Sequence, residues 1–316
     1  MKKLFRILLA FVALLIVGLT IFWFSRSLDV DFEAVRSQVS HAEFSHFTDI
    51  DGVRVHYQEC GTGAPLVLVH GFMASTSDWK DVLPLVSNRF HVVALDLKGF
   101  GFTAKPSGDY TLATQAGLVV RLLDHLKIDK AVLCGQSMGG NVVLHVAAQH
   151  PERVSALILV DSAGLKILQG KSRGAVPGFA RWPVIGPLVT ALALSSDGVV
   201  RDGLRKCYYD KAEVTEERVA TCYRVLKTRA GLSAAMATQA LESTDLTESV
   251  IGSLGQPTLV IWGAHDQLIP LDAARRFNAL IRGSRLVVFE QCGHAPQLEM
   301  PGRLAREVSE FLSSLR

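Results

Sequence analysis

Hydrophobic positions along the chain form three kinds of pattern, and each predicts a different element. One uninterrupted apolar run covers Ile7 to Phe24. Short continuous apolar runs, such as 65–70 (PLVLVH) and 90–95 (FHVVAL), are typical of parallel strands that are covered on both faces. Helical spacing of leucines marks 111–126. The chain therefore combines one long apolar segment with a domain built from short strands and amphipathic helices.

Strand-like and helix-like segments alternate through most of the chain. The expected strands are 47–50 and 53–58, which form a hairpin around Asp51-Gly52, then 65–70, 90–95, 131–135, 155–160, 257–262 and 285–289. The expected helices are 111–126, 138–149, 271–281 and 301–315. This alternation predicts an α/β domain with a mostly parallel central sheet and helices on both faces.

The alternation is interrupted once, and the interruption predicts the domain organisation. Residues 166–253 show helical patterns and no convincing strand, so we interpret them as a helical cap over the carboxyl edge of the sheet, where ligands bind in such folds. The core then consists of 47–165 and 254–316. Residues 26–46 are a polar linker, and residues 1–25 are a membrane anchor helix.

The N-terminal apolar run predicts a transmembrane helix. About 18 uncharged residues come close to the length that crosses a bilayer core. Lys2, Lys3 and Arg6 precede them, and Trp23 stands near the far end. The end of the run, with Phe22, Trp23, Phe24 and Arg26, does not supply an A-x-A-like cleavage site, which favours an uncleaved anchor over a cleaved signal peptide. The basic residues at the start predict a cytoplasmic N-terminus and an extracytoplasmic domain.

Composition narrows the possible partners. The chain has 316 residues, 49% of them hydrophobic, and a formal net charge of only +3. This balance, without a Lys/Arg-rich run in the domain, argues against nucleic-acid binding. The five cysteines lack the CxxC spacing of zinc or redox sites. A bridge between Cys207 and Cys222, on consecutive predicted helices, stays open if the domain faces an oxidising compartment.

Residues 135–139 (GQSMG) match the G-x-S-x-G pattern between a predicted strand and a predicted helix, which is the context that this pattern requires. On such a sharp turn, side chains in place of Gly135 or Gly139 would collide with neighbouring backbone. The turn presents the Ser137 hydroxyl in the cleft and points the helix N-terminus at developing negative charge. Ser137 is therefore the candidate nucleophile, and an ordinary glycine-rich turn is the alternative.

A serine hydroxyl needs a base, and that base needs an orienting group. His294 follows the last predicted strand, and Asp266 follows the strand before it. Both positions lie at the same sheet edge as Ser137, so His294 is the candidate base and Asp266 the candidate acid. Asp161, at the end of the strand before the cap, is the rival acid.

His70-Gly71-Phe72 follows the first central strand. A loop in this position supplies one oxyanion-hole N–H, and the residue after the nucleophile supplies the other. The backbone N–H groups of Phe72 and Met138 are the candidates. The alternative is that the dipeptide merely terminates a strand.

Taken together and in this order, the segments HGFMAS, DLKGFGFTAKP, GQSMGG, WGAHDQLIP and QCGHAPQLEMP resemble the α/β-hydrolase superfamily over residues 47–316. Serine at position 137 disfavours the epoxide hydrolase and haloalkane dehalogenase branches, which carry aspartate there. The glycine-rich loop departs from the family's DxRGxGxS pattern at Lys98 and Thr103, a loop that is mainly structural. The N-terminal helix with GxSMGG resembles membrane-anchored monoacylglycerol lipases and related esterases, and the domain also resembles the C–C bond hydrolases of aromatic degradation.

The resemblance implies an α/β-hydrolase fold and the hydrolysis of carboxylic esters through an acyl-enzyme, with a small-molecule or lipid ester as substrate and no metal or organic cofactor. C–C, amide or thioester hydrolysis by the same residues stays open, as does a catalytically inactive binding protein. The apolar stretch 175–194 predicts either a buried cap helix or a lid that dips into the bilayer.

Overall fold

The computed structural model describes residues 2–165, 196–240 and 246–315. Its centre is a sheet of eight strands in the order β1-β2-β4-β3-β5-β6-β7-β8. Strand β2 runs antiparallel to both of its neighbours, β1 and β4, and the strands β4, β3, β5, β6, β7 and β8 are parallel to one another. The strands are β1 (Ser45–Ile50), β2 (Val53–Cys60), β3 (Ala64–Val69), β4 (Phe90–Leu95), β5 (Ala131–Gln136), β6 (Val154–Val160), β7 (Thr258–Gly263) and β8 (Arg285–Phe289).

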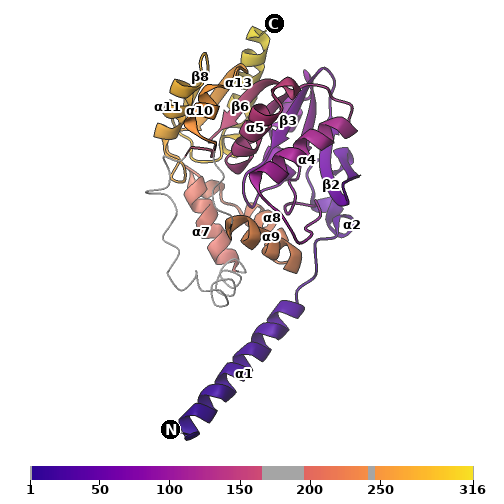
Figure 1. The fold of residues 1–316 in the computed structure, drawn as a ribbon, viewed down its shortest axis with the longest axis vertical. Coiled ribbons are helices and arrows are strands. Elements are labelled where there is room, and N and C mark those ends of the chain that lie inside the picture. Colours follow the sequence, from indigo (N-terminus) through magenta and orange to yellow (C-terminus); the bar gives the residue numbers. More distant parts are fainter. Residues whose placement is uncertain (1, 166–195, 241–245, 316) are drawn as a thin grey trace.

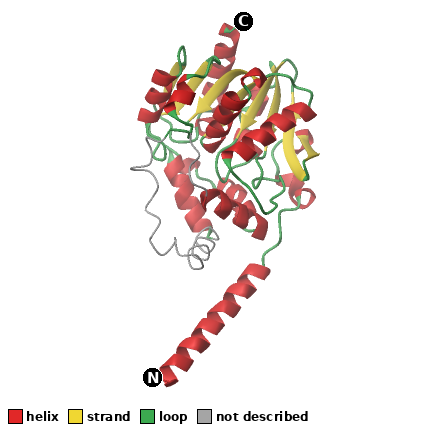
Figure 2. Ribbon diagram, viewed as in Figure 1, coloured by secondary structure: helices red, strands yellow, loops and turns green. Residues whose placement is uncertain are grey.

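Helices cover both faces of this sheet (Figure 2). The α-helices of the described chain are α1 (Lys2–Phe24), α2 (Phe32–Val35), α3 (Leu83–Val86), α4 (Leu112–His125), α5 (Met138–Gln149), α7 (Asp197–Cys207), α8 (Glu216–Leu226), α9 (Arg229–Ala240), α10 (Glu248–Gly252), α11 (Leu271–Leu280), α12 (Pro296–Glu299) and α13 (Pro301–Ser314). Short 3-10 turns join several of them.

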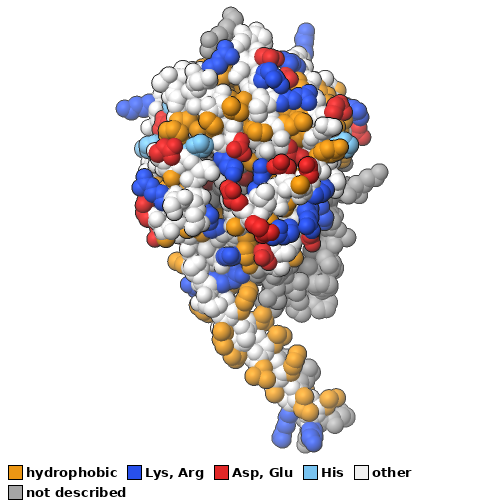
Figure 3. Space-filling view, turned by 180° about the vertical axis from the view of Figure 1, so that it is seen from behind, with side chains coloured by type: hydrophobic (Ala, Val, Ile, Leu, Met, Phe, Trp, Pro, Cys, Tyr) orange, Lys and Arg blue, Asp and Glu red, His pale blue; other side chains and the backbone are white. Residues whose placement is uncertain are grey.

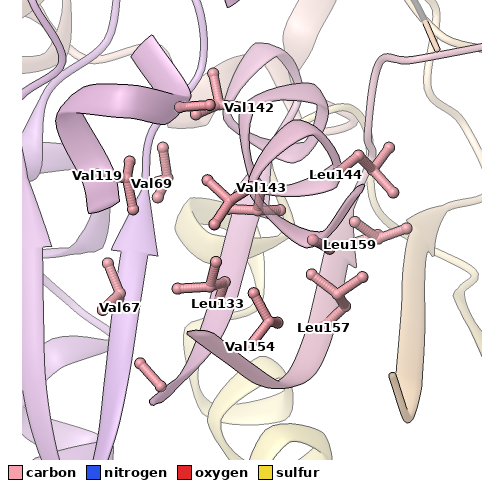
Figure 4. Packing of buried hydrophobic residues seen from close by; sticks show 14 of the residues in the cluster. Val67, Val69, Val119, Leu133, Val142, Val143, Leu144, Val154, Leu157 and Leu159 are labelled. Atoms are coloured by element: carbon pink, nitrogen blue, oxygen red, sulfur yellow. The ribbon is translucent and has the colours of Figure 1, made fainter. Parts of the chain in front are cut away.

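The central strands are apolar throughout because alternate residues enter two different cores. In β3, Val67 and Val69 pack towards α4 and α5, as Figure 4 shows. Leu66 and Leu68 of the same strand pack on the opposite face, where α3 and α13 lie. The predicted mostly parallel sheet with helices on both faces is confirmed, and α5, β4 and β8 have the predicted bounds.

The β1–β2 hairpin turns at Asp51 and Gly52, both with positive φ of 53° and 76°. Two successive residues with positive φ suit the twist of a tight hairpin, and Asp-Gly is a preferred pair for it. This hairpin extends the sheet on the side away from β8 and was expected from the sequence.

Between β6 and β7 the described residues are helical, with α7, α8 and α9 side by side below the sheet in Figure 1. These helices lie within the segment that the sequence predicts to be a cap. The apolar stretch 175–194, with its predicted lid, lies outside the described residues. The domain boundaries therefore stay a prediction.

The N-terminal helix α1 stands apart from the domain (Figure 1). Its 22-residue apolar part, Lys3–Phe24, is long and apolar enough to cross a membrane, and it is the one helix of the described chain that is. Apolar side chains cover it, with basic side chains at its free end (Figure 3). A signal sequence would have the same properties, so the anchor stays a proposal.

The segment after α1 is fastened to the cap helices. The carbonyls of Ser27 and Leu28 accept hydrogen bonds from the first N–H groups of α9, those of Arg229 and Ala230, at 3.0 and 2.9 Å. The Lys105 ammonium, whose side chain is fully buried, lies 2.8 Å from Asp29. The predicted linker is therefore a docked segment rather than a free tether.

Candidate active site

Ser137 stands on a sharp turn between β5 and α5. Its backbone has φ 51° and ψ −118°, a conformation that an L-residue rarely adopts. A Cβ at Gly135 would overlap the backbone of Gly139, and a Cβ at Gly139 would overlap the carbonyl oxygen of Val69. Only glycine allows β5, α5 and β3 to approach this closely, so the G-x-S-x-G pattern has a steric basis here.

His294 and Asp266 come together at the carboxyl edge of the sheet. His294 Nδ1 lies 2.7 Å from Asp266 Oδ2, and the Asp266 side chain is fully buried. The other oxygen, Oδ1, accepts the N–H groups of Leu268 and Ile269 at 2.7 and 2.9 Å. Three donors therefore hold the carboxylate, and the acid in contact with the histidine is Asp266 rather than Asp161.

The loop that carries His294 is held at its backbone as well. The His294 N–H donates to the carbonyl of Cys207 at 2.6 Å, and the His294 carbonyl accepts the Gln136 amide at 2.8 Å. Glu299 Oε1 accepts the N–H of Gly293 at 2.8 Å. These contacts were not predicted from the sequence. Of the residues that make them, Gln136 lies inside the G-x-S-x-G pattern.

The loop after β3 passes directly beside the candidate nucleophile. A Cβ at Gly71 would lie 3.1 Å from Ser137 Cβ, which shows how near the two backbones are. His70 fixes this loop: its Nδ1 contacts the Gly71 carbonyl at 2.7 Å, and its Nε2 accepts the Leu97 N–H at 3.0 Å. Complete burial lowers the pKa of His70, so the imidazole is neutral and Nδ1 carries the proton.

A cavity of about 700 Å³ opens beside these residues. Ser137, His294 and Phe72 line it from the core side. Apolar side chains of α7 and the segments around it complete the wall, among them Val200, Leu204, Tyr208, Leu268 and Leu298. The cavity is therefore mostly apolar and is built jointly by the core and by the helices between β6 and β7.

One polar group of this cavity wall is an acid. Asp78, in the 3-10 turn Thr76–Trp79, has its pKa raised to about 7, because burial penalises its charge more than nearby Arg218 stabilises it. Arg218 donates to the Tyr208 hydroxyl at 2.7 Å.

Among the described residues, four Lys or Arg side chains line the cavity, namely Lys80, Lys206, Arg218 and Arg224. Three of them are engaged, in the contacts Lys80–Glu217, Arg218–Tyr208 and Arg224–Gln38. Most of the positive charge around the cavity is therefore already neutralised or hydrogen-bonded by the protein.

The bridge that the sequence left open between Cys207 and Cys222 is not formed, and both residues are free thiols in the cavity wall. Burial raises the pKa of the Cys207 thiol to about 12 and raises that of Cys222 as well. These thiols are therefore protonated at neutral pH and are poor nucleophiles.

Asp96 of the glycine-rich loop is a structural hub. Its carboxylate accepts the N–H groups of Thr76 at 2.6 Å and Phe102 at 2.8 Å, and it contacts His56 Nδ1 at 2.7 Å. The Asp96 and His56 side chains are fully buried, and these partners lower the pKa of Asp96 against the effect of burial. Thr103 adds a hydrogen bond to the Asp96 carbonyl at 2.7 Å, so threonine fills the role expected of serine there.

Asp161, Asp266 and His294 offer ligand atoms within 4.8 Å of one another, and they are the one set of metal-ligand type among the described residues. Within this set, His294 Nδ1 points at Asp266 at hydrogen-bond distance. A shared proton explains that contact, so these atoms need no metal to be brought together.

The chain is similar to known proteins in sequence and in fold. Residues 64–301 match the sequence profile of the α/β hydrolase fold family. The chain is 31% identical over 288 residues to a 2-hydroxy-6-oxo-2,4-heptadienoate hydrolase of Pseudomonas putida, covering 87% of this chain and 98% of that protein.

Solved structures of similar shape include a serine hydrolase involved in carbazole degradation, with a TM-score of 0.75, 27% identity and coverage of 86% of this chain and 99% of the other. A membrane phospholipase A has a TM-score of 0.71 and 26% identity, covering 100% of this chain and 99% of that one.

Proposed function

Because this chain belongs to the α/β-hydrolase family, we propose that it is a membrane-anchored serine hydrolase that cleaves carboxylic esters through an acyl-enzyme. The observation that carries the proposal is the apolar cavity of about 700 Å³ that has Ser137 and His294 in its wall. An apolar acyl chain has the chemistry to fill such a cavity, with its carbonyl carbon at the serine.

In the proposed mechanism His294 is the base and Ser137 the nucleophile. Since His294 Nδ1 is bound to Asp266, Nε2 is left as the proton acceptor. Nε2 takes the proton of the Ser137 hydroxyl while its oxygen forms a bond to the ester carbonyl carbon. The tetrahedral intermediate then collapses, the C–O bond to the alcohol breaks, and His294 returns the proton to the departing oxygen. Water attacks the acyl-enzyme by the same route and releases the acid.

The negative oxygen of the tetrahedral intermediate needs donors in place before the reaction. We assign the backbone N–H groups of Phe72 and Met138, one on the loop after β3 and the other at the first residue of α5. The close approach of Gly71 to Ser137 supports this assignment, because it brings that loop beside the nucleophile. Each such donor contributes about 3 kcal/mol of barrier lowering in enzymes of this chemistry.

Two observations support a neutral lipid-like ester as substrate. In the part of the wall that the structure describes, most side chains are apolar, and three of the four cations are engaged by the protein. The helix α1 would hold the domain at a bilayer, where such a substrate is concentrated. In this arrangement the N-terminus is cytoplasmic, the hydrolase domain is extracytoplasmic, and residues 166–253 form the cap.

The second candidate is C–C bond hydrolysis, which the printed activity of the Pseudomonas putida relative favours. That substrate is a dienoate and carries a carboxylate. A carboxylate would need a cation in the cavity, and Lys206 is the remaining lysine or arginine among the described residues of the wall. The two candidates therefore differ in the charge of the substrate that the cavity accepts.

The test is hydrolysis by the full-length chain in vesicles, with Ser137→Ala as the blank. Nitrophenyl esters of increasing acyl length are compared with 2-hydroxy-6-oxo-2,4-heptadienoate. We expect Ser137-dependent turnover of the esters that rises with acyl length. Turnover of the dienoate alone would establish the second candidate, and no turnover of either would leave a binding protein on this fold.

The anchor is tested separately by extraction of cell membranes. Full-length protein should stay with the membrane in high salt and in carbonate and be released by detergent. Recovery of a shortened, soluble chain would show that residues 1–25 are a cleaved signal instead.

A further inference from the structure

A second carboxyl group is buried beside the proposed acid. Asp161 follows β6 directly, is fully buried, and has a positive φ of 41°. Its Oδ1 accepts the N–H of Gly263 at 3.0 Å. Its Oδ2 is buried and has no hydrogen-bond partner among the described residues. The carboxyl groups of Asp161 and Asp266 have oxygens within 4.8 Å of each other. The proposed mechanism gives this group no role.

The two carboxyl groups differ sharply in the donors that they receive. Asp266 accepts from Leu268, Ile269 and His294. Among the described residues, Asp161 accepts from Gly263 alone. Two carboxylates buried this close together repel each other, so a proton on one of them is favoured, and the one with more donors keeps the charge. The proton of the pair therefore belongs on Asp161, and Oδ2 is the atom free to carry it.

We propose that Asp161 is a positioning residue that carries a proton on Oδ2 and donates it to the Asp266 carboxylate, steadying the group that orients His294. The inference rests on the proposed function, since it assumes that His294 is the base. A neutral acid in this place adds a donor to Asp266, beside those of Leu268 and Ile269, without adding negative charge to the site.

The electrostatic surroundings agree with this assignment. Burial, followed by the charge of Asp266, raises the pKa of Asp161 well above its ordinary value. Glu299 of α12 raises it further, and the Cys292 thiol nearby has its own pKa raised by burial, so it stays neutral. His294 is the basic group in the same cluster, and its Nδ1 is turned to Asp266.

A neutral aspartic acid has a close mimic in asparagine. In Asp161→Asn the amide oxygen can still accept the Gly263 N–H, and the amide nitrogen can still donate to Asp266. In Asp161→Val both hydrogen bonds are lost, and the branched side chain also strains the backbone at this positive φ. Asp161→Val therefore tests the loss of the hydrogen-bond donor to Asp266, and Asp161→Asn tests whether a negative charge stood at position 161.

The experiment measures kcat, KM and the acid limb of the kcat/KM–pH profile on a nitrophenyl ester for the full-length protein. We expect Asp161→Asn to leave the acid limb in place, because no charge is removed. We expect Asp161→Val to lower kcat by roughly tenfold to a hundredfold with little change in KM, the loss typical of one hydrogen bond to a charged group.

A downward shift of the acid limb in Asp161→Asn by roughly one pH unit would overturn the proposal, because it would mean that a negative charge had stood near His294. This variant decides the matter even if Asp161→Val does not fold.

Infrared spectroscopy detects the proton on the Asp161 carboxyl group directly and does not require catalytic turnover. At neutral pH the wild type should show a protonated-carboxyl band that Asp161→Asn lacks, and its absence from the wild type would count against the proposal. If no ester is hydrolysed, the proposed function fails while this measurement still reports on Asp161.

Discussion

The backbone N–H of His294 donates to the carbonyl oxygen of Cys207, 2.6 Å away, at the last residue of α7. A second bond lies next to it, from the N–H of Tyr209 to Glu299 Oε2 at 2.6 Å. The loop of the proposed base is therefore bonded to the helices between β6 and β7. We therefore expect that a movement of α7 would also move His294.

The proposed nucleophile and acid can be tested by substitution. Ser137→Ala should remove ester hydrolysis, and Asp266→Asn should lower kcat by about 10⁴, because the imidazole loses its orientation. A fluorophosphonate probe should label wild type and not Ser137→Ala. Ser313→Ala, on the exposed side of α13, is the matched control and should behave as wild type. Labelling that survives Ser137→Ala would point to a different nucleophile.

Gly139 should tolerate no side chain. In Gly139→Ala the new Cβ would overlap the carbonyl oxygen of Val69, so α5 must move away from β3 and carry the Ser137 turn with it. We expect loss of ester turnover together with a lower melting temperature. Gly255→Ala is the control, since a Cβ there meets nothing within 4 Å. Full activity in Gly139→Ala would contradict the steric account of the turn.

Asp96 should matter for stability more than any surface ion pair. Asp96→Ala leaves His56 and two backbone N–H groups buried without their partner, which costs about 3–5 kcal/mol of unfolding free energy. Glu59→Ala breaks the more exposed contact with His91 and should cost about 1 kcal/mol or less. Urea denaturation of both variants measures the difference, and equal costs would refute the assignment of Asp96 as a hub.

Asp78 should make stability depend on pH. Its pKa is about 7 in the folded protein and near 3.8 when unfolded, so between these values the folded state binds more protons. Stability from this group is therefore lost as pH rises from about 4 to 7, by no more than about 4 kcal/mol. Asp78→Asn should raise the melting temperature at pH 8 more than at pH 5. The exposed Asp202→Asn should show the same small change at both pH values.

The thiols should be unreactive in the folded protein. Burial raises the pKa of all five cysteines, that of Cys207 to about 12. Iodoacetamide at pH 7.5 should therefore leave esterase activity intact, and labelling should become complete only in denaturant. Rapid modification of Cys207 or Cys222 with loss of activity would show that the cavity thiols are more exposed and more acidic than this structure indicates.

The sequence predicted the centre of the sheet well because the central strands are buried on both faces. Continuous apolar runs such as 90–95 are typical of such strands, and the bounds of this run agree with β4. The bounds of 285–289 agree with the edge strand β8, which is only partly buried. The G-x-S-x-G pattern placed Ser137 correctly on a turn between β5 and α5, since the glycines there are required by contacts that any such turn makes.

The contacts between distant segments could not be read in the same way. Nothing in the spacing of residues indicates that the Cys207 carbonyl reaches His294, because a backbone atom has no signature in the sequence. The choice between Asp161 and Asp266 as the acid also required the three-dimensional structure. Both aspartates follow strands at the same edge, and only the 2.7 Å contact of Asp266 with His294 separates them.

The docked segment after α1 limits how far the hydrolase domain can move from the end of this helix. Two residues, Ser25 and Arg26, separate the end of α1 at Phe24 from Ser27, whose carbonyl is already bonded to Arg229. So short a piece of chain spans at most about 11 Å. In the anchored protein that we propose, the hydrolase domain is therefore held within about 1 nm of the end of the membrane helix. It can reach lipid elsewhere in the bilayer only if the helix itself diffuses or tilts.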